Sequence, residues 1–116
     1  MFLNVSNHDS RLWSEEQLSS AVSLAGSVED MPFPNVEPGA DSERLDRMAT
    51  DLFEGIRQRK PEVVHIMGEL TLCHRVVNLL KREGIKTVAS TTERDVTLSE
   101  DGVKTVRFRF VRFREY

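Results

Sequence analysis

The sequence predicts a three-layer α/β domain, in which a parallel sheet lies between helices and a β-hairpin follows at the C-terminus. From residue 2 to residue 89, short apolar runs alternate with helical patterns, as is typical of parallel strands joined by right-handed crossovers. The last part of the chain alternates apolar residues with arginines, which predicts antiparallel strands. A chain of 116 residues can bury one core, so a single domain over residues 1–116 is expected.

Four apolar runs are predicted to form the parallel strands. The third, residues 63–67, is apolar almost throughout, and only a strand covered on both faces is expected to have that composition. We therefore expect it at the centre of the sheet. The four runs are residues 2–5, 28–31, 63–67 and 85–89.

Three helices are predicted between these strands. The first begins after Ser14, because Gln17 three residues later completes a capping-box pattern. It runs through the apolar positions Leu18 and Val22 to Gly26, which suits a helix C-terminus. The second begins after Asp41 or Ser42 and carries apolar residues at helical spacing through residue 56. The third covers residues 70–82 and ends before Gly84.

Two further segments complete the predicted fold. Three prolines exclude a helix over residues 32–39, which we expect to form an ordered loop over the carboxyl ends of the strands. Residues 96–98 and 103–113 are expected to form the hairpin, with a glycine-containing turn between them. Its apolar positions change parity between Phe110 and Val111, which predicts a β-bulge there.

The charge and composition of the chain argue against two classes of partner, duplex nucleic acid and membranes. The formal net charge is −3, which disfavours non-specific coating of duplex nucleic acid, a mode that needs a broad cationic surface. No apolar run approaches the roughly 18 residues of a membrane helix, so no membrane partner is expected. Cys73 has no second cysteine to pair with. Together with an N-terminus that lacks a leader pattern, this favours a cytoplasmic location.

Polar side chains follow three of the predicted strands. In an open parallel sheet the carboxyl ends of the strands face one crevice, where ligands bind. Hydroxyl, amide, imidazole and guanidinium groups gathered there suit a polar anion. The candidate ligand-binding residues are Ser6, Asn7, Gly68, Glu69, Thr71, Thr91, Thr92 and Glu93, and the candidate catalytic residues are His8 and Arg94.

For each group of candidate residues there is a chemical reason to expect a functional role, and there is also a simpler structural interpretation. His8 can donate to an anion or transfer a proton near neutral pH, and Arg94 can hold a phosphate through two hydrogen bonds. Gly68 allows close approach of a ligand to a helix N-terminus. The alternatives are a polar turn around His8, helix capping by Glu69 or Thr71, and a solvated loop around residue 94.

Other conspicuous residues are expected to be structural. Trp13 is expected to pack before the Ser14 cap, with base stacking as the alternative. Cys73 belongs to an apolar helix face, and His65 within a buried strand is expected to have its hydrogen bonds satisfied. The chain has no glycine-rich dinucleotide or phosphate-loop motif and no metal-ligand cluster, so no cofactor and no metal are expected.

Six short segments of the chain point to a family. They are NVSNH (4–8), WSEEQ (13–17), GELT (68–71), VVNLLK (76–81), ASTTER (89–94) and FRFVRFREY (108–116). Together they resemble small stand-alone CRISPR-associated proteins that consist of a CARF domain with a Rossmann-like fold. The resemblance implies a homodimer that binds cyclic tetra- or hexa-adenylate, the second messenger of type III CRISPR antiviral defence, on its two-fold axis. Some of these proteins are ring nucleases that cut the messenger without metal.

The resemblance also implies roles for the candidate residues. The ribose 2′-hydroxyl would attack its own phosphodiester and leave a 2′,3′-cyclic phosphate, with His8 as acid or base and Arg94 stabilising charge. Two alternatives stay open at this point. One is a sensor that binds the ring without cutting it, and the other is an unrelated flavodoxin-like module that binds a mononucleotide or a protein.

Overall fold

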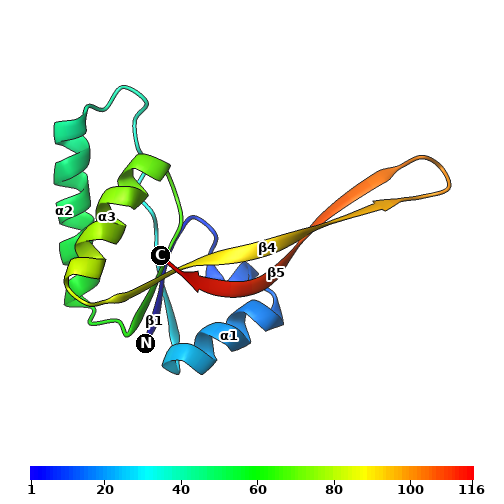
Figure 1. Ribbon diagram of the computed structural model, residues 1–116, viewed down its shortest axis with the longest axis horizontal. Helices are drawn as coiled ribbons and strands as arrows, with labels where there is room; N and C mark the ends of the chain where they lie inside the picture. Colours follow the sequence, from blue (N-terminus) through cyan, green and yellow to red (C-terminus); the bar gives the residue numbers. More distant parts are fainter.

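The computed structural model describes all 116 residues and shows a five-stranded sheet with helices on both faces (Figure 1). This confirms the α/β class and the C-terminal antiparallel pair. The elements are β1 (Phe2–Val5), the short 3-10 helix η1 (Ser10–Leu12), α1 (Glu15–Ala25), β2 (Val28–Met31), α2 (Ser42–Gln58), β3 (Val63–Ile66), α3 (Leu70–Arg82), β4 (Lys86–Leu98) and β5 (Lys104–Glu115).

The strand order is β2-β1-β3-β4-β5. Strands β1 to β4 are mutually parallel, and β5 runs antiparallel to β4 at the sheet edge. β3 is the middle strand and all four of its residues are buried, which confirms the central position predicted from its apolar composition. In the register of β1 with its neighbours, Val5 lies between Met31 and Ile66, so the ends of β1, β2 and β3 lie level.

α2 and α3 cover one face of the sheet (Figure 1). Asp41 is the N-terminal cap of α2, because its carboxylate accepts from the backbone N–H of Arg44. The predicted apolar stripe is confirmed, because Leu45, Ala49 and Ile56 are all buried against the sheet and α3. None of the helices is both long enough and apolar enough to cross a membrane.

α1 covers the opposite face of the sheet, but the residues that it turns toward the sheet are not its large apolar ones. Its N-terminal cap is confirmed, since the hydroxyl of Ser14 accepts from the backbone N–H of Gln17. However, Leu18 and Val22 are 40% and 44% exposed, while Gln17 and Ala21 face the sheet. The reason is that aromatic rings already fill this side of the sheet, leaving room for only small or slender side chains. The cluster there contains Phe2, Trp13, Ala21, Val63, Val88, Phe110 and Phe113.

β4 is much longer than predicted. The polar residues 90–94, expected as a loop after a strand, continue the same strand to Leu98. β5 pairs with β4 from Val88 to Leu98, so the polar segment has a backbone partner throughout and needs no core of its own. The predicted bulge is confirmed, because Thr91 lies opposite Arg112 and Thr92 opposite Phe110, which leaves Val111 as the extra residue.

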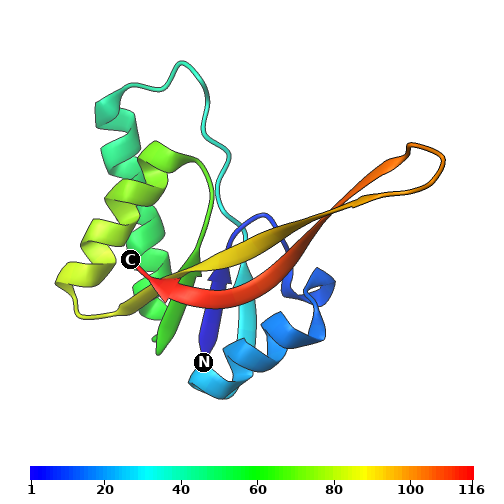
Figure 2. The same ribbon diagram turned by 45° about the vertical axis from the view of Figure 1, so that its right-hand side comes forward.

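The outer parts of β4 and β5 extend away from the body as a two-stranded arm (Figures 1 and 2). We define the arm as residues 93–109. The Cα radius of gyration is 16.1 Å, whereas a compact chain of this length has about 13 Å. The arm is therefore the feature that departs from a compact domain.

The loop over residues 32–39 packs on the body through Phe33, which is 4% exposed. Its ring lies directly over Gly68, at the end of β3. A Cβ built on Gly68 would overlap Cδ1 of Phe33, because the two atoms would lie much closer than carbon atoms approach. Gly68 is therefore required by packing, whatever its contact with a ligand.

We expect Gly68→Ala to lower the free energy of unfolding by about 1–3 kcal/mol, because Phe33 must leave its position. Urea unfolding measures the change. Gly39→Ala is the matched control, since nothing lies within 4 Å of its added Cβ. In a Phe33→Ala background, Gly68→Ala should lower the free energy of unfolding by less, because the ring that the added methyl group would meet is absent. Equal stabilities of Gly68→Ala and Gly39→Ala would contradict this packing account.

Candidate functional site

A hollow of about 1200 Å³ opens between the carboxyl ends of β1 and β3, the N-terminal part of α1, and the base of the arm. It lies on the α1 side of the sheet. Only 5 of its 19 lining residues are hydrophobic, so polar groups are available to a ligand beside the apolar parts of the lining side chains. The lining residues are 6–8, 12–17, 65, 67, 68, 90, 92, 95 and 107–110.

The structure brings half of the predicted site residues together in this hollow. Those that line it are Ser6, Asn7, His8, Gly68 and Thr92. The other five candidates lie outside it, on the N-terminus of α3 or on β4.

Glu69 and Thr71 form the N-terminal cap of α3. The carboxylate of Glu69 accepts from the backbone N–H groups of Thr71 at 3.0 Å and Leu72 at 2.8 Å, and also from the Thr71 hydroxyl. The Thr71 hydroxyl and these two N–H groups hold the pKa of Glu69 below its usual value. The capping alternative thus accounts for both side chains.

Thr91, Glu93 and Arg94 belong to the β4–β5 ladder. The Thr91 hydroxyl donates to the carbonyl of Arg112, and Glu93 forms an ion pair with Arg109. Arg94 is exposed and lies opposite Phe108 on the arm. Their displacement from the hollow follows from the length of β4, which places residues 90–94 along a ribbon instead of in a loop.

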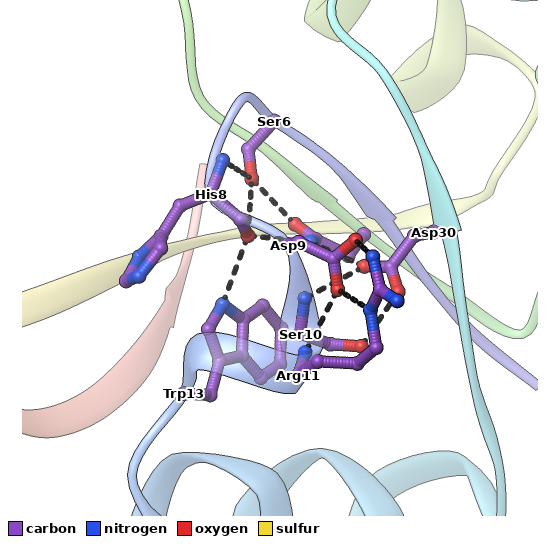
Figure 3. Close-up of polar contacts among 8 residues, drawn as sticks. Ser6, His8, Asp9, Ser10, Arg11, Trp13 and Asp30 are labelled. Carbon is purple, nitrogen blue, oxygen red and sulfur yellow. Dashed lines mark hydrogen bonds and ion pairs between the residues drawn. The ribbon is translucent and has the colours of Figure 1, made fainter.

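A hydrogen-bonded network fixes the loop after β1 (Figure 3). The buried amide of Asn4 donates through Nδ2 to the carbonyl of His8 at 2.9 Å and to Asp30 at 2.8 Å. The His8 carbonyl also accepts from Nε1 of Trp13 at 3.1 Å. The His8 backbone is therefore held on two sides, while its imidazole is exposed and points away from the network (Figure 3).

The next residues anchor the loop to β2. The Asp30 carboxylate accepts from the backbone N–H of Ser10 at 3.0 Å and from its hydroxyl at 2.6 Å. Asp9 accepts from the side chain of Arg11, and this contact lowers the pKa of Asp9. The segment that carries His8 is thus an ordered turn, in which a side chain can hold a defined position.

His65 is the site residue that the sequence did not reveal. Its Nδ1 lies 2.8 Å from Oδ1 of Asn4. Since Nδ2 of Asn4 donates to two acceptors, Oδ1 is the acceptor of the amide and His65 Nδ1 must carry the proton. The other ring nitrogen, Nε2, is buried and has no partner.

The protonation state of His65 follows from its surroundings. The residue is 2% exposed and packs against Phe2, Trp13 and Phe113. Burial lowers its pKa to about 4, with a further contribution from His8, so the ring is neutral at pH 7. His65 lies in the wall of the hollow, and its Nε2 is an unpaired acceptor nitrogen buried beneath the surface.

His65 was expected to be a satisfied interior histidine, and this expectation is wrong for one of its two ring nitrogens. The sequence does contain a signal, although only the strand register makes it readable. Asn4 and His65 are directly opposite each other on the central strands β1 and β3. Two polar residues paired at the centre of an apolar sheet indicate a specific buried hydrogen bond between their side chains.

Charged groups stand around the rim of the hollow. Arg107 and Arg109 come from β5, and Glu15, Glu16 and Asp95 face them from α1 and β4. Arg109 is engaged by Glu93, whereas Arg107 takes part in none of the ion pairs of the protein. Arg107 lies opposite Asp95 in the strand register but forms no ion pair with it, so it is the rim cation available to an anion. No group of three or more His, Cys, Asp or Glu side chains is arranged to hold a metal ion.

The family model that matches this chain covers residues 1–114. The chain belongs to the Uncharacterized protein MJ1673 family. The match to the MJ1673 family includes both β1 and the arm, so both walls of the hollow lie within it. No curated protein and no solved structure matches the chain.

The buried neutral state of His65 makes the stability of this MJ1673-family chain dependent on pH. The unfolded chain takes up a proton below the ordinary histidine pKa of about 6.5, but the folded chain does so only near pH 4. Between these values the unfolded state binds more protons, so stability falls as pH falls. The full loss is on the order of 3 kcal/mol.

Urea unfolding at pH 7.5 and pH 4.5 measures this contribution. We expect His65→Asn to lose most of the pH dependence, because an amide keeps a donor toward Asn4 without taking up a proton. His74→Gln is the control, since His74 is exposed on α3, and it should retain the wild-type dependence. A His65→Asn variant with the unchanged pH dependence would show that another group is responsible.

Proposed function

We propose that two copies of this chain bind a cyclic oligoadenylate of type III CRISPR signalling and cut it as a metal-independent ring nuclease. One observation carries the proposal. Polar groups from the ends of β1 and β3 and from the arm converge on one hollow, whose rim carries an arginine outside every ion pair and whose wall buries an unpaired acceptor nitrogen. The sequence resemblance described above supplies the chemical identity of the ligand.

The groups in the hollow suit a nucleotide. Nε2 of His65 is a buried acceptor in the wall of the hollow, and a donor such as an adenine amino group or a ribose hydroxyl would reach it only after the surrounding side chains move. The hydroxyls of Ser90 and Thr92 can contact phosphate oxygens, and Arg107 can neutralise phosphate charge. A cyclic ligand with internal symmetry needs two equivalent half-sites, and one chain provides one of them.

The proposed reaction is an intramolecular transesterification. The ribose 2′-oxygen bonds to the neighbouring phosphorus and the bond from phosphorus to the 5′-oxygen breaks, leaving a 2′,3′-cyclic phosphate and a 5′-hydroxyl. The proton of the 2′-hydroxyl leaves to a base, and the departing 5′-oxygen takes up a proton. His8 suits one of these transfers, because its imidazole is exposed in the hollow while its backbone is held in place.

The phosphate contact is assigned to Arg107 in this proposal, in place of Arg94. Arg94 is outside the hollow and on the arm, whereas Arg107 lines the hollow without an ion-pair partner. Ser6 has a supporting role, because its hydroxyl is occupied by Asn4 Oδ1 at 2.7 Å. The contacts with ligand at the surface of the hollow then come from His8, Thr92 and Arg107.

The test is incubation with cyclic tetra- and hexa-adenylate in EDTA, with products identified by mass spectrometry and binding measured by thermal shift. Linear products ending in a 2′,3′-cyclic phosphate are expected. His8→Ala should lower the cleavage rate about 10²–10⁴-fold with little change in binding. Arg107→Gln should weaken binding by about 1.5–3 kcal/mol, the range for a charge-assisted contact.

Arg47→Gln is the matched control, because Arg47 is exposed on α2, on the opposite face of the sheet from the hollow. It should bind and cleave as the wild type does. A raised melting temperature with an intact ring would mean a sensor instead of a nuclease. No rise with either ring would contradict the proposal, since a ligand of the native state must stabilise it, and would favour a flavodoxin-like module.

A further inference from the structure

The arm has two chemically different faces. Residues directly opposite each other in an antiparallel pair point to the same side, so the register assigns every paired residue of the arm to a face. One face, which we call the apolar arm face, carries four apolar residues and two cations, and the other carries polar residues and opposite charges set against each other. The apolar arm face consists of Arg94, Val96, Leu98, Lys104, Val106 and Phe108, and the polar face of Glu93, Asp95, Thr97, Thr105, Arg107 and Arg109.

The apolar arm face is uncovered in the single chain. Phe108 is 71% exposed and Leu98 73%. The same side of the ribbon carries Phe110 and Phe113 nearer the body, where both are buried in the cluster beneath α1. A two-stranded ribbon standing alone in water is only marginally stable. Near the body, α1 buries this side of the ribbon. An element packed on the apolar arm face would bury the outer part in the same way.

The outward face of α1 is also uncovered, and its charges are the opposite of those on the arm. Leu18 and Val22 are exposed there. α1 carries Glu15 and Glu16 in its first turn and has no basic residue. The apolar arm face carries Arg94 and Lys104 and no carboxylate. One chain therefore presents an acidic apolar helix and a cationic apolar ribbon, each without a partner.

We propose that the partner of both surfaces is a second copy of the chain. The apolar arm face of each copy lies on the outward face of α1 of the other. The contact is reciprocal, so a two-fold axis relates the copies and each surface is used twice. In this arrangement Arg94 faces the acidic first turn of the partner's α1.

This interface deepens the homodimer of the proposed function and does not depend on the identity of the ligand. Glu15 and Glu16 of α1 and Phe108 of the arm line the rim of the hollow. The outward face of α1 and the apolar arm face therefore both start at the rim of the hollow, and a partner bound to them lies next to the hollow. The two hollows come together near the axis, where a symmetric ligand could contact both.

The first test is the mass in solution without nucleotide, by light scattering at micromolar concentration. The wild type should show twice the 13.3 kDa of one chain. Phe108→Glu and Val22→Glu should each raise the dimer dissociation constant about 100-fold or more, because a two-fold interface buries each new carboxylate twice. The controls Thr97→Glu, on the polar arm face, and Ser23→Glu, beside Val22 on α1, should remain dimeric. A monomeric wild type, or dimers that persist in both variants, would overturn the proposal.

A disulfide trap tests which surfaces meet. The native Cys73 is buried, so Val106→Cys and Val22→Cys each add one reactive thiol. Mixed under mild oxidation, the two variants should cross-link to each other at least ten times faster than either does to itself. Faster self-linking of Val106→Cys would mean that arm packs on arm, and would overturn the proposal.

These outcomes are separate from those for the ligand. Loss of ring binding with an intact dimer would refute the proposed function and leave the interface standing. Ring binding by a dimer that persists in both Phe108→Glu and Val22→Glu would refute the interface and leave the proposed function standing.

Discussion

The buried side chain of Asn4 is the contact on which the site depends. Its amide connects β1 to Asp30 on β2, to His65 on β3 and to the carbonyl of His8 in the following loop. An amide that is 1% exposed must have its hydrogen bonds satisfied inside the protein. By satisfying them it assigns the proton of His65 to Nδ1, leaves Nε2 as an acceptor, and holds His8 at the rim of the hollow.

The long β4–β5 ribbon has two functions in the fold. Near the body, the bulge at Val111 allows Phe110 and Phe113 to enter the same aromatic cluster although they are three positions apart. This cluster replaces the apolar helix face that α1 would otherwise provide, so Leu18 and Val22 remain outside. Farther out, the ribbon projects as the arm and carries Arg107 to the hollow. The bulge therefore connects the filling of the core to the exposure of both proposed contact surfaces.

Some parts of this arrangement could be predicted from particular residues. The stripe of Leu45, Ala49 and Ile56 in α2 and the apolar composition of β3 correctly gave the helix and the central strand, because burial on one or both faces leaves a direct periodic signal. Ser6, Asn7 and His8 were correctly placed beside Gly68, because parallel strands end at one edge. Residues 90–94 were misplaced because a polar ribbon has no periodicity that distinguishes it from a loop.

The α/β class, the central strand, the helix caps and the bulge can be read from the sequence alone, since each depends on neighbours along the chain or on a repeating burial pattern. Which side chains meet depends on the folded chain as a whole. The pairing of Asn4 with His65 spans 61 positions and exists because β1 and β3 lie in one register. The length of β4 depends on β5 as a partner, and the exposure of α1 depends on aromatic residues from three distant segments. Such contacts are set by the packing of the whole chain, and no local pattern encodes them.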